Sequence, residues 1–131
     1  MNSDGFKRFE DPIAWQRAHE LARNIYKTTL RSNFNRDFAL RDQIRRAALS
    51  PMCNIAEGYA RSGPKEFLRF LDIARGSSAE VQSLLYIAKA SDYISAEEFR
   101  QLYELADEVT ALIAGLTRSL RVKQFQRQQA T

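Results

Sequence analysis

Few residues of this chain could carry nucleophilic or metal chemistry. The sequence holds one cysteine, Cys53, and one histidine, His19. A cysteine nucleophile needs a base and an activating environment, while a structural zinc site needs four ligands, which this pair cannot supply. We therefore expect Cys53 to be a small residue near a helix contact, with a catalytic thiolate as the alternative. We expect no enzymatic activity, no cofactor and no metal.

Carboxylates offer no better candidate for catalysis. Glu57 and Glu80 lie in arginine-rich segments, where ion pairing is their expected role. A metal-binding helical bundle would combine glutamates with Glu-x-x-His motifs, which this sequence does not contain. It has no glycine-rich phosphate loop either.

Basic residues are the third chemical candidate, because clustered lysine and arginine side chains bind phosphate backbones without sequence preference. The net charge is +4, and no acid follows Thr117. The alternative is a salt-bridged surface, since aspartates and glutamates are interleaved with the earlier arginines. The candidate nucleic-acid-binding residues are Arg41, Arg45, Arg46, Arg61, Lys65, Arg69, Arg118, Arg121 and Lys123.

Helical periodicity dominates the segments that must position these side chains. Apolar residues recur at spacings of three and four, and they predict four helices at about 12–31, 37–61, 64–91 and 95–123. Asp11 as a cap and Pro12 at the first helical position predict the first start, and the capping box Ser95 to Glu98 predicts the last. Short loops force antiparallel neighbours. We predict an all-α, up-down-up-down four-helix bundle over 12–123, an N-terminal arm over 1–11, and a frayed, basic, glutamine-rich tail over 124–131.

Composition agrees with one such domain. Apolar residues make up 44% of the chain and charged residues 27%, as in soluble globular proteins. No apolar run approaches the roughly 18 residues that span a bilayer, and the first residues lack the apolar core of a signal peptide. We therefore expect a cytoplasmic protein with no membrane partner.

Two helix faces fall outside the predicted core. The second helix carries a polar stripe made up of Gln43, Arg46, Ser50, Asn54, Glu57 and Arg61. We interpret it as a contact with another helix or subunit, with plain solvation as the alternative. The third helix has a core stripe through Phe67, Phe70, Ala74, Ser77, Val81, Leu84 and Ala88, yet two isoleucines lie away from it. Apolar residues on a second face favour self-association. The candidate subunit-interface residues are Gln43, Ser50, Asn54, Glu57, Ile73, Glu80 and Ile87.

Several segments together resemble a known family. They are FEDPIAWQRAHELA, QIRRAALSPMCNIAEGYAR, KEFLRFLDIARGSSAEVQSLLYIAKASDYIS and the final leucine-rich helix. The combination resembles the bacterial four-helix-bundle family of intervening sequences in large-subunit ribosomal RNA genes, and it is similar to the accessory variability protein of diversity-generating retroelements. One departure is the proline, which here directly follows Ser50 and in that pattern comes one residue later.

The resemblance implies a non-enzymatic homo-oligomer, a ring of five protomers, that binds RNA or DNA as an accessory factor. It also implies that the partners include a reverse transcriptase or ribosomal RNA. The alternative function is a protein-interaction scaffold without nucleic-acid binding, in which the arginines serve only ion pairs between helices.

Overall fold

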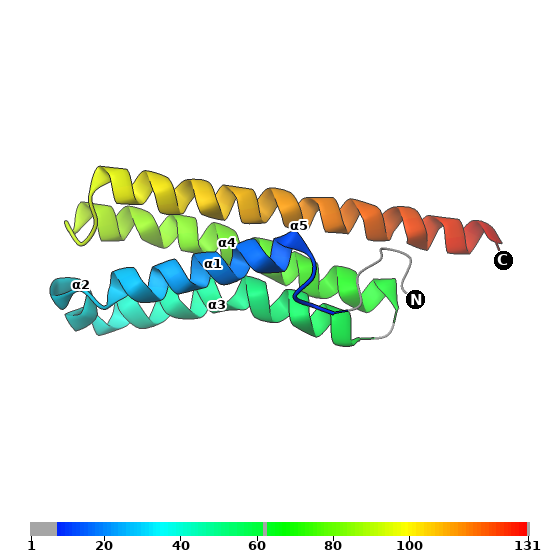
Figure 1. Ribbon diagram of the computed structural model, residues 1–131, viewed down its shortest axis with the longest axis horizontal. Coiled ribbons are helices and arrows are strands. Elements are labelled where there is room, and N and C mark those ends of the chain that lie inside the picture. The colour runs from blue at the N-terminus through cyan, green and yellow to red at the C-terminus, as the bar shows by residue number, and fades with distance from the viewer. Residues whose placement is uncertain (1–7, 62, 131) are drawn as a thin grey trace.

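Four long antiparallel helices form the protein. The computed structural model describes residues 8–61 and 63–130, and within them the secondary structure is helical, without strands. The helices are α1 (Ile13–Thr29), α2 (Ser32–Arg36), α3 (Phe38–Ala60), α4 (Pro64–Ala90) and α5 (Ala96–Ala130). Helix α1 packs against α3 and α5, while α4 packs against α3 and α5 from the other side (Figure 1). The predicted all-α four-helix bundle is confirmed.

The short helix α2 is absent from the sequence-based prediction, which placed a loop there. Phe34 on this single turn is buried, and its ring stacks on Tyr93 with ring centroids 5.0 Å apart. The Tyr93 hydroxyl donates to Asp37 Oδ2 at 2.9 Å, and Asp37 Oδ1 accepts the Leu40 N–H at 3.1 Å as the N-cap of α3. One buried aromatic side chain therefore fixes the α1–α3 connection against the α4–α5 loop.

The start of α1 differs from the prediction. Pro12, with φ −63° and ψ 139°, is the N-cap, so the expected cap at Asp11 is wrong. The Asp11 carboxylate instead accepts the Arg8 N–H at 3.2 Å and closes the turn before the helix. Proline fits an extended N-cap because its ring fixes φ near this value.

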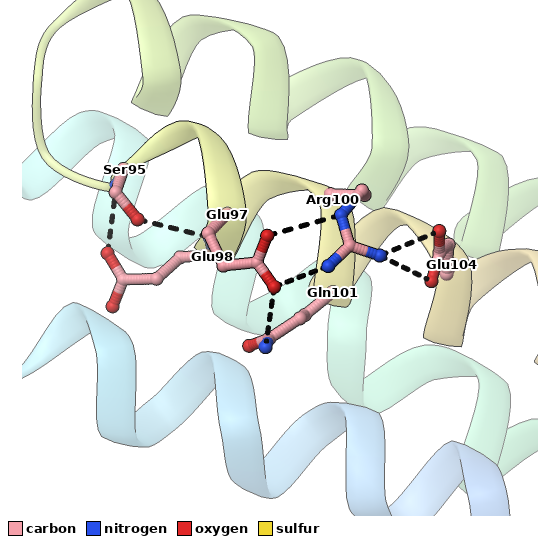
Figure 2. Close-up of polar contacts among 6 residues, drawn as sticks. All are labelled: Ser95, Glu97, Glu98, Arg100, Gln101 and Glu104. Carbon is pink, nitrogen blue, oxygen red and sulfur yellow. Dashed lines mark hydrogen bonds and ion pairs between the residues drawn. The ribbon is translucent and has the colours of Figure 1, made fainter.

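The capping box at the start of α5 is confirmed. Glu98 Oε1 accepts the Ser95 N–H at 2.8 Å, and Ser95 Oγ accepts the Glu98 N–H at 3.1 Å (Figure 2). Arg31, which follows α1, also pairs with the Glu98 carboxylate. Hydrogen bonding from Arg31, then from the Ser95 backbone, lowers the pKa of Glu98 to about 2. The cap is therefore also a link between α1 and α5.

The buried face of α4 is rotated slightly from the predicted stripe. Ser78 and Leu85 are buried where the periodicity placed Ser77 and Leu84. The reason is that α4 has helix neighbours on two sides, and Ser78 Oγ donates to the Ala106 carbonyl of α5 at 3.0 Å. The buried α4 residues are Phe70, Leu71, Ala74, Ser78, Val81, Leu85 and Ala88.

The C-terminal segment is helical rather than frayed. Helix α5 continues to Ala130, and its last turns extend past the neighbouring helices (Figure 1). Pro51 is buried inside α3, which runs on through it. Residues 1–7 of the predicted arm, Ser62 and the last tail residue, Thr131, lie outside the described residues. Across the described helices, none combines the length and apolar character that a bilayer crossing requires.

Candidate nucleic-acid interface

A basic groove lies between the first turns of α4 and the C-terminal half of α5. We call it the α4–α5 groove; its volume is about 520 Å³. Its lining carries five basic and two acidic side chains, so it is positive by three charges. It is lined by Lys65, Glu66, Leu68, Arg69, Asp72, Arg75, Ala114, Thr117, Arg118 and Arg121.

Ion pairing leaves part of this positive charge available. Arg75 Nη2 lies 2.9 Å from Asp72 Oδ1, and Arg69 Nε lies 3.8 Å from Glu66 Oε2. Within residues 8–61 and 63–130, Lys65, Arg118 and Arg121 make no ion pair. Exposed cations without acidic partners can contact phosphate oxygens without first breaking an internal ion pair.

The structure brings together Lys65, Arg69, Arg118 and Arg121 from the predicted nucleic-acid-binding set. Arg61 follows the end of α3 close to the start of α4, and its guanidinium lies 5.3 Å from the centroid of the Phe70 ring. Lys123 lies on α5, one turn or less from Arg121. Arg75 also lines the groove, although it was not predicted. The sequence could have indicated Arg75, because it follows Asp72 by three residues on the side of α4 that carries Lys65 and Arg69.

Arg41 and Arg45 lie at the other end of the bundle and contact their own chain. Arg41 Nε lies 2.8 Å from Asp42 Oδ1, and its Nη1 donates to the Asn35 carbonyl at 3.0 Å. Arg45 Nε donates to Thr29 Oγ1 at 2.8 Å, and the guanidinium lies 4.8 Å from the Tyr26 ring centroid. These two arginines hold α1 and α2 against α3 and stand apart from the α4–α5 groove.

The polar stripe of α3 faces α4 of the same chain at several positions. Ser50 and Ser77 are in hydrogen-bond contact, and Gln43 Nε2 donates to Glu80 Oε2 at 3.4 Å. Asn54 Nδ2 donates to the Ser50 carbonyl and hydroxyl, both at 2.9 Å. A small cavity of about 290 Å³ lies beside this contact, lined by Gln43, Arg46, Ala47, Ser50, Ser77 and Glu80.

The other predicted subunit-interface residues lie on the outer surface. Ile73 is 43% exposed and Ile87 is 54% exposed, both on α4. Glu57 is exposed on α3, and its carboxylate lies 3.8 Å from Arg61 Nη2. The structure therefore leaves two isoleucines of one helix open to a partner.

Cys53 and His19, the two residues considered for nucleophilic or metal chemistry, lie on different helices. Cys53 is exposed on α3. His19 on α1 stacks on Trp15 with ring centroids 5.0 Å apart. In the part of the chain that the structure describes, no three His, Cys, Asp or Glu side chains gather as a metal site would require.

Comparison with known proteins identifies a family and a similar solved structure. The family model described as 23S rRNA-intervening sequence protein matches residues 10–115. A crystal structure of a protein of unknown function from the S23 ribosomal protein family of Bacteroides thetaiotaomicron superposes with a TM-score of 0.74. The two chains are 21% identical, and the match covers 81% of this chain and 96% of that one. No curated protein matches.

Proposed function

This chain belongs to the 23S rRNA-intervening sequence protein family, and we propose that it is a non-enzymatic accessory protein that binds RNA or DNA. The binding surface is the α4–α5 groove, and the phosphate backbone is the group recognised. Lys65, Arg118 and Arg121, which line the groove without ion-pair partners among the described residues, are the observation that carries this proposal. The family name adds a reason to test ribosomal RNA first.

The geometry supports a backbone ligand rather than a small molecule. The groove is open, and its cations come from two helices along its length. Such a row of cations attracts a polyanion through many weak contacts, each of which releases counterions. Binding of this kind is independent of sequence and falls steeply with salt.

We further propose that copies of the chain associate, in a ring of five. The exposed Ile73 and Ile87 support this proposal, because they lie two heptads apart on the outer face of α4, with Glu80 midway between them. A ring would repeat the α4–α5 groove around its circumference, and the modest charge of one groove would add up over the copies.

A titration tests the nucleic-acid proposal directly. The probes are labelled single-stranded RNA and DNA, and fluorescence anisotropy is measured at low and at moderate salt. The variant Arg118→Glu/Arg121→Glu is expected to lose most of the binding. Arg23→Glu/Arg36→Glu is the matched control, because it reverses two exposed charges away from the groove.

The outcomes separate the competing functions. Absence of wild-type binding to any polynucleotide at low salt refutes the proposal and leaves the protein-interaction scaffold. The ion pair between Arg17 of α1 and Glu108 of α5 favours that alternative, because it joins two helices. Equal losses in the two double variants would show that net charge, and not the groove, governs binding.

A further inference from the structure

The end of α5 carries an exposed aromatic ring beyond the α4–α5 groove. Phe125 is 60% exposed, and Val122 beside it is 56% exposed. Both lie on the last turns of α5, which extend past the other helices (Figure 1). Phe125 is not part of the hydrophobic core, and most of its ring is open to a ligand or a partner.

Helix geometry aligns Phe125 with the groove. It follows Arg121 by four residues and Arg118 by seven, and residues at these spacings share one face of a helix. At 1.5 Å per residue, the ring lies about 6 Å and about 10 Å farther along the helix axis than these two arginines. A chain that passes through the groove along α5 therefore meets the ring next.

We propose that Phe125 stacks on a base of a single-stranded nucleic acid whose phosphates occupy the α4–α5 groove. This inference rests on the proposed function and narrows its ligand. A duplex hides its base faces inside the stack, so a single ring at a helix surface cannot reach them. A single strand exposes the face of every base, and aromatic rings beside a cationic track are the usual way of binding one.

The basic residues near Phe125 argue against a second copy of the chain as the partner that covers its ring. From Thr117 to the C-terminus the sequence has four basic residues and no acid. Two copies meeting through this segment would bring like charges together, which opposes association. An anionic single strand offers bases that stack on the ring and phosphates that pair with the cations beside it.

The test compares ligands that differ only in their bases. The probes are an oligothymidylate of about 16 nucleotides, at the upper end of known site sizes, the abasic strand of the same length, and a duplex. Phe125→Ala is expected to weaken oligothymidylate binding by about 5- to 150-fold, the range for loss of one stacked base. Binding of the abasic strand and of the duplex should be unchanged.

Two further variants control for structure and apolar area. Phe125→Trp keeps an aromatic face and should retain tight binding to oligothymidylate. Val122→Ala removes an exposed apolar side chain from the same turns and should have little effect. Circular dichroism checks that each variant keeps its helix content.

Each possible result either supports the stacking role of Phe125 or overturns it. Unchanged oligothymidylate affinity in Phe125→Ala, an equal loss on the abasic strand, or an equal loss in Val122→Ala overturns the stacking role. A change in molar mass of Phe125→Ala by light scattering would assign the ring to a contact between copies and overturn it too. In all these cases the proposed function would still be supported if wild-type binding depended on Arg118 and Arg121. Absence of wild-type binding to every probe would remove both.

Discussion

The hydroxyl oxygens of Ser50 in α3 and Ser77 in α4 lie 2.6 Å apart. Ser77 Oγ also donates to the Ile73 carbonyl at 3.0 Å, and Asn54 Nδ2 donates to Ser50 Oγ at 2.9 Å. Because the Ile73 carbonyl can only accept, the Ser77 proton is used there, and Ser50 must donate to Ser77. A directed chain of hydrogen bonds therefore runs from Asn54 through both serines to the backbone of α4.

Replacing Ser50 by alanine interrupts this chain of hydrogen bonds at its centre. We expect Ser50→Ala to lower the free energy of unfolding by about 1 kcal/mol, the net contribution of a half-buried hydrogen bond. Urea denaturation measures the change. In a double-mutant cycle, Ser50→Ala and Ser77→Ala should cost less together than the sum of the two, because both remove the same contact. Additive losses would contradict the proposed chain of hydrogen bonds.

Gly58 is expected to tolerate no larger side chain. A Cβ built there would lie 2.5 Å from Phe67 Cδ1 and 2.8 Å from Phe67 Cε1, and this ring also packs on Tyr59. Gly58→Ala should destabilise the protein by about 1 to 3 kcal/mol, despite the better helix propensity of alanine. Gly76 in α4 is the matched control, since no described atom lies within 4 Å of a Cβ there. Gly76→Ala should stabilise the folded chain by about 0.5 to 1 kcal/mol. Similar effects at both glycines, measured by urea denaturation, would refute the steric account.

The Glu98 cap predicts an acid-dependent loss of stability. Its pKa is lowered from 4.5 to about 2 in the folded chain, first by the hydrogen bond from Arg31. Between these values the unfolded chain binds the proton more readily, so the stabilisation is complete above pH 4.5 and is lost as the pH falls towards 2. With its side chain 29% exposed, we expect a loss of about 1 kcal/mol after solvent screening.

Thermal unfolding from pH 7 to pH 3 measures this effect. Glu98→Gln should lower the melting temperature at pH 7 and flatten the decline between pH 5 and pH 3 relative to wild type. Glu104→Gln is the control, because it removes a carboxylate from α5 that contacts Arg100 and not the cap (Figure 2). If the acid-dependent decline in melting temperature persisted unchanged in Glu98→Gln, it would arise from titratable groups other than Glu98.

The salt dependence of binding would count the phosphate contacts proposed for the α4–α5 groove. A plot of log affinity against log salt concentration falls by about 0.7 for each phosphate neutralised on a single strand. Arg118→Gln should weaken binding on all sequences alike and reduce this slope by about one contact. Arg45→Gln should leave the slope unchanged, because Arg45 contacts Thr29 and Tyr26. A reduced slope in the Arg45 variant would place phosphate contacts at the opposite end of the bundle.

Self-association is tested at the outer face of α4. Ile73→Glu/Ile87→Glu should give a lower molar mass than wild type by light scattering, because two carboxylates would have to be buried in the contact. Ile13→Glu on α1 is the control, since Ile13 is similarly exposed, at 52%. A wild-type chain that is monomeric at micromolar concentration would contradict the proposed ring.

The helices themselves could be predicted from the sequence because their signals are local. The Ser95 to Glu98 capping box and Pro64 at the start of α4 act within one turn, and both hold in the structure. The periodicity also identified most of the core. It missed α2, since the burial of Phe34 depends on Tyr93, a residue distant in the chain.

By itself, the sequence determined four amphipathic helices, their starts to within one residue and an excess of basic residues. It listed nine basic candidates without separating them. Only the tertiary structure decided which of them lie together, because antiparallel packing sets the first turns of α4 against the late turns of α5 and brings Lys65 and Arg69 beside Arg118 and Arg121. The same packing places Arg41 and Arg45 at the far end, where contacts with their own chain occupy them. Helix formation follows short-range rules, whereas a groove between helices depends on pairings between residues far apart in the chain.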